Sequence, residues 1–313
     1  MNLSPTITDF PAYEIADALN RHLQVHNTMV VTAPPGAGKS TILPLTILDA
    51  LPEGKIILLE PRRIAARQVA IRMADLLGEE VGETVGYRVR YETRVSRKTR
   101  LEGVTEGILT RMLIEDSTLD GVKVVIFDEF HERSIHSDLS LALARETQSI
   151  LRDDLRLVIM SATIDTEKIS TALSAPVLHS KGFLYPVDIQ YTPIDQSTPG
   201  SIARLVLQAH RSAEGDILVF LPGQWEIDRC AELLTPALPD TAVCPLYGAL
   251  SIADQQRAIM PSPDGKRKVV LATNIAETSL TIEGVRIVID SGLYRTLVYD
   301  QRTCLSHLET KMI

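Results

Sequence analysis

Short apolar runs that alternate with helix-like stretches limit the possible folds of this chain more than any other feature. Runs such as "KIILLEP" and "KRKVVLATN" have continuously apolar centres, as do strands that are buried on both faces. Helix-like stretches such as "IAARQVAIRMADLL" lie between them, so the alternation predicts mostly parallel sheets covered by helices. The expected strands are residues 28–33, 55–61, 122–129, 155–163 and 175–180 in the first half, and 215–222, 241–248, 266–274 and 285–292 in the second.

The length of 313 residues allows two such α/β domains in tandem. Residues 180–200 hold three prolines and two glycines, which is typical of a boundary between domains. We therefore expect a first domain over residues 1–180 and a second over residues 181–313.

The overall charge argues against a nucleic-acid-binding protein, because the formal net charge is −8. A local exception is the basic segment, residues 88–100, which carries five arginines and one lysine against the single acid Glu92. Tyr87 and Tyr91 lie beside or within it. The segment is either a solvated surface, as most runs of charge are, or a contact for a phosphate backbone.

Other features exclude several classes of protein. The chain has no run of 18 apolar residues that would predict a membrane span, and its first ten residues do not resemble a signal peptide. Its three cysteines are far apart, so we expect neither a disulfide framework nor a zinc site, and a reducing cytoplasm fits best. Trp225, the one tryptophan, is expected to lie partly buried in a core rather than to stack on a base.

The sequence "APPGAGKST", residues 33–41, follows the first expected strand and predicts a phosphate-binding loop. Gly36 and Gly38 allow a tight turn whose N–H groups face phosphate oxygens. Lys39 would reach the outer phosphates, and Ser40 would ligate Mg²⁺. The strict pattern has glycine where this chain has Ala33. The alternative, a simple turn that begins a helix, fits the full pattern poorly.

The sequence "VVIFDEFHERS", residues 124–134, ends an apolar strand in a cluster of charges. Asp128 is placed to hold the metal, and Glu129 to orient and deprotonate an attacking water. An Asp-Glu pair alone is usually a solvated strand end, but together with the phosphate-binding loop it predicts nucleotide hydrolysis. His131 by itself would more often be structural.

Four further clusters, "EPRRIAARQVA", "VTEGILTRML", "MSATID" and "TNIAETSLTIEGV", complete a recognisable set. With "DEFHER" they resemble the DEAH-box helicases of superfamily 2. Phe130, "LEPRR" and "LYGALS" are similar to the bacterial HrpB-like subgroup. The resemblance implies two RecA-like domains, the second incomplete, that use ATP or another nucleoside triphosphate with Mg²⁺ and bind single-stranded nucleic acid.

The resemblance also implies a role for each matching residue. Catalysis would use Lys39, Asp128 and Glu129, with Ser40 and Asp128 at the metal. The nucleotide would contact Gly36, Ala37, Gly38, Lys39, Ser40, Thr41, Arg72 and Ile259. The nucleic acid would contact Arg62, Arg63, Thr105, Gly223, Thr273, Asn274 and Thr278. Coupling between the two sites would use His131, Ser161 and Thr163.

Several of these residues have simpler explanations. Arg62 and Arg63 could lie over a helix surface, and the Ser and Thr residues could be helix caps. Ile259 stands where the family has an aromatic side chain, so we expect weak selectivity for the base. The resemblance favours RNA over DNA, whereas the residues themselves do not distinguish the two.

A glutamine-arginine-glycine motif, QRxGRxGR, supplies catalytic arginines in the family but is absent from these 313 residues. Such arginines contribute about 10³–10⁵-fold in rate. We therefore expect this polypeptide to bind nucleotide, to hydrolyse it slowly and not to unwind duplexes. The alternatives are a P-loop ATPase that remodels other substrates and a non-catalytic module that binds nucleic acid or a protein partner.

Overall fold

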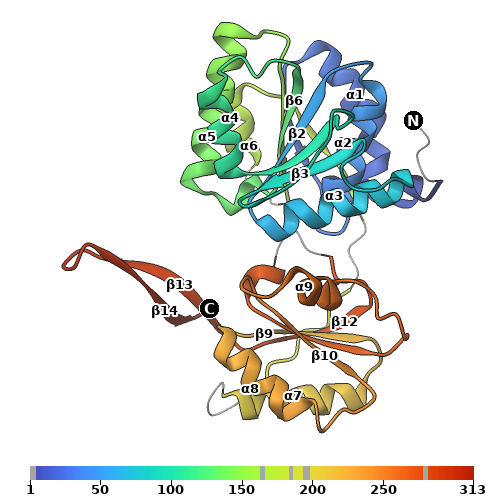
Figure 1. The fold of residues 1–313 in the computed structure, drawn as a ribbon, viewed down its shortest axis with the longest axis vertical. Helices are drawn as coiled ribbons and strands as arrows, with labels where there is room; N and C mark the ends of the chain where they lie inside the picture. The colour runs from blue at the N-terminus through green and yellow to red at the C-terminus, as the bar shows by residue number, and fades with distance from the viewer. Residues whose placement is uncertain (1–4, 163–165, 183–185, 193–197, 278–280) are drawn as a thin grey trace. The chain divides into compact units, whose positions relative to one another are not determined.

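The computed structural model describes residues 5–162, 166–182, 186–192, 198–277 and 281–313. The chain divides into two compact units, Met1–Val187 and Asp188–Ile313, coloured blue to green and yellow to red in Figure 1. The division lies within the proline-containing segment of residues 180–200. In the described ranges, no helix is both long and apolar enough to cross a membrane.

The first unit is built on an eight-stranded sheet of order β4-β3-β5-β2-β6-β7-β1-β8. Neighbouring strands are parallel except for the antiparallel pair β3 and β4. The carboxyl ends of the parallel strands therefore share one edge. The strands are β1 (Thr28–Thr32), β2 (Lys55–Glu60), β3 (Val85–Val89), β4 (Glu92–Arg94), β5 (Leu101–Thr105), β6 (Val122–Phe127), β7 (Arg156–Ser161) and β8 (Val177–His179).

Helices cover both faces of this sheet, with α1–α3 on one face and α4–α6 on the other (Figure 1). Alternate residues of the central strands enter two separate cores: Ile56 and Leu58 face α1–α3, whereas Ile57 and Leu59 face α4–α6. The helices are α1 (Ala16–Val25), α2 (Lys39–Ala50), α3 (Arg63–Leu77), α4 (Glu106–Glu115), α5 (Ile135–Glu146) and α6 (Thr166–Leu173), with short helical turns η1 (Pro5–Asp9), η2 (Pro11–Ile15), η3 (Phe130–Glu132) and η4 (Thr147–Leu151).

All five strands expected in this half are present, but the sequence analysis missed β3, β4 and β5. These strands lie in a region rich in arginine, threonine and glycine, so they lack the apolar runs that mark the others. Gly103 of β5 shows why a small residue is needed there. A Cβ at this position would approach the Ala66 carbonyl oxygen of α3 to 3.1 Å, so glycine allows α3 to pack closely on the sheet.

The second unit holds a four-stranded parallel sheet of order β10-β11-β9-β12, as expected. Figure 1 shows α7 and α8 on one face of this sheet and α9 on the other. The strands β13 and β14 form an antiparallel hairpin that extends away from it. The elements are α7 (Pro199–Ser212), β9 (Asp216–Phe220), α8 (Gln224–Leu234), β10 (Ala242–Leu246), α9 (Ile252–Ile259), β11 (Lys268–Ala272), the turn η5 (Asn274–Ala276), β12 (Val285–Asp290), β13 (Leu293–Asp300) and β14 (Leu305–Met312).

The expectation that Trp225 is partly buried is wrong, because this residue is 65% exposed. Helix α8 packs on the core through Ile227, Cys230 and Leu234. Trp225 precedes Ile227 by two positions, which places it on the far side of a helix with 3.6 residues per turn. Its side chain therefore lies on the outer surface.

Candidate functional site

The loop between β1 and α2 has the backbone conformation of a phosphate-binding loop. Gly36 and Gly38 have φ angles of 76° and 88°, in the left-handed region that favours glycine. A Cβ at Gly38 would lie 2.9 Å from side-chain carbons of both Ile42 and Phe10. Ala37 accepts a hydrogen bond from the Ala12 backbone N–H at 2.9 Å, which ties the loop to η2. Ser40 and Thr41 are partly exposed in the first turn of α2.

Lys39 brings this loop together with the carboxyl end of β6. Its Nζ lies 2.5 Å from Oε1 of Glu129, and both side chains are only 6% exposed. Asp128 is also buried, and its Oδ1 accepts a hydrogen bond from the Glu129 N–H at 2.8 Å. Glu129 has a φ of 48°, an unfavourable backbone conformation for this residue type. The three predicted catalytic residues therefore meet in one buried site.

The site perturbs the pKa values of its acids and of its lysine. Burial, with a smaller contribution from Asp128, raises the pKa of Glu129 to about 7. Burial, followed by Asp128 and Glu129, raises the pKa of Glu60 well above its ordinary value. Burial by itself would lower the pKa of Lys39, but Asp128 and Glu129 outweigh it and raise this pKa. Lys39 is thus held in its charged form among acids that are easily protonated.

His131 links this site to the segment after β7. Burial, followed by the charge of Lys39, lowers the pKa of His131, so its ring is neutral near pH 7. Its Nδ1 accepts a hydrogen bond from the Ala162 N–H at 3.4 Å and lies 3.3 Å from Oε2 of Glu129. Ser161, beside Ala162, is 1% exposed. A neutral Nδ1 is an acceptor, so the approach to Glu129 is a contact between acceptors rather than an ion pair.

The donor groups of this site fit Mg²⁺ that arrives with a nucleotide. Oδ2 of Asp128 is buried and has no hydrogen-bond partner among the described residues. Within the same residues, no group of three or more His, Cys, Asp or Glu side chains could hold a metal by itself. Mg²⁺ commonly takes one or two carboxylates and completes its shell with phosphates and water. Asp128 and Ser40 would therefore hold the metal beside the phosphates.

Three of the predicted nucleic-acid contacts lie at the carboxyl edge of the first sheet. Thr105 ends β5 directly opposite Glu60, the last residue of β2, and Arg62 and Arg63 follow β2. Arg62 is partly exposed and pairs with Glu132 at 3.2 Å, whereas Arg63 is exposed. The Thr105 side chain makes no capping hydrogen bond to α4.

The basic segment is exposed at the β3–β4 turn and again just after β4. The guanidinium of Arg90 lies 4.8 Å from the ring centre of Tyr91, which is 87% exposed. Two arginines of the basic segment have structural partners instead. Arg88 pairs with Glu102 at 2.9 Å, and Arg100 donates hydrogen bonds to the Gly54 and Leu51 carbonyls. The segment therefore offers exposed cations and a ring, but fewer than the sequence alone implies.

Three further predicted contacts, Gly223, Thr273 and Asn274, lie at the carboxyl edge of the second sheet. Gly223 follows β9, and Thr273 and Asn274 follow the adjacent β11. Thr273 makes no side-chain cap to η5. A nearby cavity of about 380 Å³ includes Asn274 and Arg295 in its lining. A Cβ at Gly223 would lie 2.6 Å from a guanidinium nitrogen of Arg295, which itself pairs with Glu226 at 3.5 Å.

Arg72 and Ile259, the residues predicted to contact the nucleotide base, differ in exposure. Arg72 is exposed on α3, but Ile259 is only 5% exposed at the end of α9, so little of its surface could contact a base. Thr163 and Thr278 lie outside the described residues.

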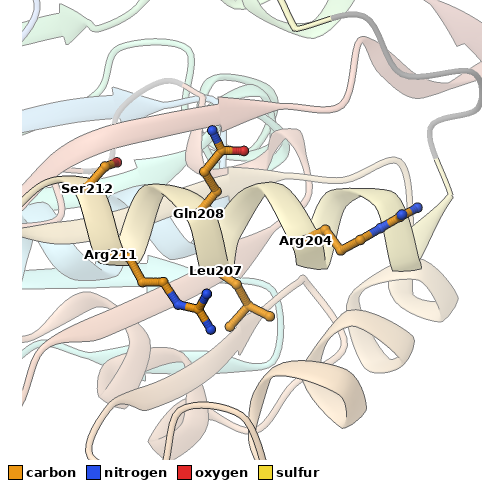
Figure 2. Close-up of a pocket in the computed structure, with 5 residues that line it drawn as sticks. All are labelled: Arg204, Leu207, Gln208, Arg211 and Ser212. Carbon is orange, nitrogen blue, oxygen red and sulfur yellow. The ribbon is translucent and has the colours of Figure 1, made fainter.

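A different, shallow pocket of about 440 Å³ lies along α7, where Leu207 and Arg211 extend to one side and Gln208 and Ser212 to the other (Figure 2). None of the predicted residues lines it.

The sequence analysis overlooked two charged residues at these strand ends. Glu60 was quoted within a motif but given no role, although it is completely buried beside Asp128. Its signal was an acid at the end of a continuously apolar strand. Arg295 had no such signal. It lies close to Gly223 in space, although the two residues are 72 positions apart in the sequence (295 minus 223).

The parallel sheets of the two units and the geometry of the phosphate-binding loop are those of a P-loop protein. The chain belongs to the DEAD/DEAH box helicase family, whose sequence pattern matches residues 14–172. The pattern of the helicase conserved C-terminal domain matches residues 199–304. These matches confirm the resemblance in the motifs.

Among characterised proteins, the chain is similar to the ATP-dependent RNA helicase HrpB of Escherichia coli K12. It is 50% identical to that protein over 98% of this chain and 39% of the relative. The HrpA helicase of Borreliella burgdorferi is 39% identical over 94% of this chain and 37% of the relative. Two crystal structures of E. coli HrpB, described as a DEAH/RHA helicase and a DExH-box NTPase, match with TM-scores of 0.90 and 0.79. Both are 50% identical and cover 97% of this chain, which spans 40% and 38% of theirs.

Proposed function

We propose that this chain is an NTP-dependent helicase core that binds ATP with Mg²⁺ and a single strand of nucleic acid, with RNA favoured. The observation that carries the proposal is the buried contact of Lys39 with Glu129 at 2.5 Å, beside Asp128. It joins a phosphate-binding loop to a carboxylate whose pKa is raised to about 7, a suitable value for a general base near neutral pH. The relatives described as RNA helicases support the choice of RNA.

In the proposed mechanism, Lys39 leaves Glu129 to bind the outer phosphates of the nucleotide. Asp128 and Ser40 would hold Mg²⁺, which would supply positive charge to neutralise the phosphates. Glu129 then orients a water molecule and takes its proton. His131, which accepts a hydrogen bond from the Ala162 N–H, would transmit the state of Glu129 to the segment after β7. Base selectivity should be weak, since Ile259 is aliphatic and buried.

The nucleic-acid strand would lie on the carboxyl edges of both sheets. Arg62, Arg63 and Thr105 would contact it from the first unit, and Gly223, Thr273, Asn274 and Thr278 from the second. Contacts through hydroxyl groups, backbone N–H groups and cations recognise phosphate rather than base identity, so sequence preference should be low. We place this activity in the cytoplasm, in keeping with the free thiols of Cys230, Cys244 and Cys304.

The 313-residue polypeptide should hydrolyse nucleotide slowly, because its sequence contains no QRxGRxGR motif. Among the described residues Arg67 is the buried arginine, and it pairs with Glu92. Strong RNA-stimulated turnover by this polypeptide would contradict this part of the proposal.

Nucleotide binding tests the function directly. Lys39→Ala should weaken the affinity for a fluorescent ATP analogue at least about tenfold, since it removes a charge-assisted contact to phosphate. Glu129→Gln should retain binding and lose about 10²–10⁴-fold in any residual turnover. If Lys39→Ala binds the analogue with wild-type affinity and Glu129→Gln keeps unchanged turnover, the proposal that this chain is a nucleotide-hydrolysing enzyme is rejected.

A further inference from the structure

A completely buried acid that the proposed mechanism does not use, Glu60, lies at the end of β2. It is 0% exposed, and neither of its carboxylate oxygens has a hydrogen-bond partner among the described residues. Oδ2 of the neighbouring Asp128 is likewise buried without a hydrogen-bond partner among the described residues. A buried carboxyl group without a hydrogen-bond partner is unfavourable whether or not it is charged. Two such carboxyl groups side by side therefore indicate that a ligand completes this site.

The register of the sheet aims both carboxyl groups at the phosphate-binding loop. The Asp128 N–H donates to the Leu59 carbonyl at 3.0 Å, which places Glu60 and Asp128 on adjacent strand ends. Side chains alternate between the two faces of a strand. Glu60 therefore shares the face of Ile56 and Leu58, which is the face covered by α1–α3 and so by the start of α2.

Asp128 lies on the same face for the same reason, because Val124 and Ile126 of β6 also belong to that core. Lys39, the first residue of α2, interacts electrostatically with both Glu60 and Asp128. The two acids and the loop that would hold the phosphates thus converge on one place.

The balance of charge at this place favours a divalent cation. One lysine, Lys39, faces the three acids Glu60, Asp128 and Glu129. A bound nucleotide adds further negative charge through its phosphates, which Lys39 alone cannot balance. A cation between the phosphates and the two orphaned carboxyl groups would offset both.

We propose that Glu60 is a further acidic residue of the Mg²⁺ site, where it faces the metal together with Asp128 and accepts hydrogen bonds from water molecules on it. This inference rests on the proposed nucleotide-binding function. Mg²⁺ usually keeps several waters, and residues that hold the outer shell of a metal typically change its affinity by 10–100-fold when mutated. Glu60 would thereby set how tightly the metal-nucleotide complex is held.

Mn²⁺ binding tests the inference without turnover. Mn²⁺ would be titrated into a solution of the protein saturated with ADP, and electron paramagnetic resonance would measure the concentration of free Mn²⁺. Glu60→Gln keeps the shape of the side chain and removes its charge, so Mn²⁺ affinity should fall about tenfold or more. The affinity for ADP in EDTA should not fall, because Glu60 faces the metal rather than the phosphates. Wild-type Mn²⁺ affinity in Glu60→Gln would overturn the inference.

Glu102→Gln is the matched control, since Glu102 is also a buried glutamate of this sheet, 1% exposed. It pairs with Arg88 and Lys55 instead of a metal site, so its replacement should leave Mn²⁺ affinity unchanged. If Glu60→Gln does not fold, the variants Glu60→Asp and Glu60→Asn can be compared instead, because aspartate and asparagine are equal in size and differ in charge. The aspartate variant should then bind Mn²⁺ more tightly, and equal affinities would refute the role.

The experiment separates this inference from the proposed function. If Mn²⁺ does not strengthen ADP binding by the wild-type chain, the proposed function itself fails. If Mn²⁺ strengthens ADP binding equally in wild type and in Glu60→Gln, only the proposed role of Glu60 fails.

Discussion

At the scale of the residue, the contact between Lys39 and Glu129 affects the protonation of Glu129, the proposed general base. The raised pKa of Glu129 results from burial and from Asp128, whereas Lys39 lowers it. When Lys39 moves to phosphate, this opposing effect weakens. In the proposed mechanism, Glu129 would then be a stronger base toward the attacking water.

This arrangement predicts a pH dependence for residual nucleotide turnover. Glu129 can accept a proton only when it is deprotonated, that is above its pKa of about 7. The value of kcat/KM for nucleotide, which reports the free protein, should therefore rise between about pH 6 and 8 and become constant above that range. Steady-state phosphate release measures it, with Glu129→Gln as the control, which should be slower and lack the rise. A flat wild-type profile over this range would be inconsistent with Glu129 as the base.

The residues also show what sequence reasoning could predict. The motif residues Lys39, Asp128 and Glu129 were identified because their chemistry depends on local spacing, and the structure brings them together. The positions of Glu60 and Arg295 were missed because they depend on strand register and on contacts between distant segments. Trp225 was misjudged because residue type alone does not give the orientation of a side chain on a helix.

At the scale of the element, the loop before α2 depends on its glycines. Gly38→Ala would force a Cβ into a left-handed conformation, 2.9 Å from Ile42 and Phe10. The variant should lose at least about 1–3 kcal/mol of stability and bind nucleotide more weakly. Gly107→Ala is the matched control on α4, where a Cβ meets nothing within 4 Å. It should be neutral or stabilising by up to about 1 kcal/mol. Urea unfolding measures both, and equal stabilities would contradict the strain.

The hairpin of β13 and β14 should be the least stable regular element in the described part of the second unit. Every residue of β14 is exposed, and an isolated two-stranded hairpin is marginally stable in water. Amide hydrogen exchange should therefore be much faster in β13 and β14 than in β9 and β11, whose residues are largely buried. Protection equal to that of β11 would mean that another surface covers the hairpin in solution.

Most of the elements were predictable because buried parallel strands carry a clear apolar signal. The strands β3, β4 and β5 were not, since their stability comes from pairing and packing that offset a polar sequence. The same polar sequence produced the basic segment, in which Arg88 and Arg100 have structural roles while Arg90 remains exposed. Composition could not separate these cases.

At the scale of the whole molecule, the central claim is that one chain couples nucleotide binding to nucleic-acid binding. Both proposed sites lie on carboxyl edges of parallel sheets, where ligands of such folds usually bind. Coupling between two ligands is reciprocal, and its typical size is about 1–3 kcal/mol, or 5–150-fold in affinity. The slow hydrolysis expected of this polypeptide makes such equilibrium measurements practical.

The most direct test is the affinity of the wild-type chain for a non-hydrolysable ATP analogue with Mg²⁺, measured with and without saturating single-stranded RNA. The account predicts that RNA strengthens nucleotide binding at least about fivefold. Lys39→Ala should bind the analogue weakly in both conditions. An affinity that is the same with and without RNA, and the same in Lys39→Ala, would contradict the claim that this chain is a nucleic-acid-coupled helicase core.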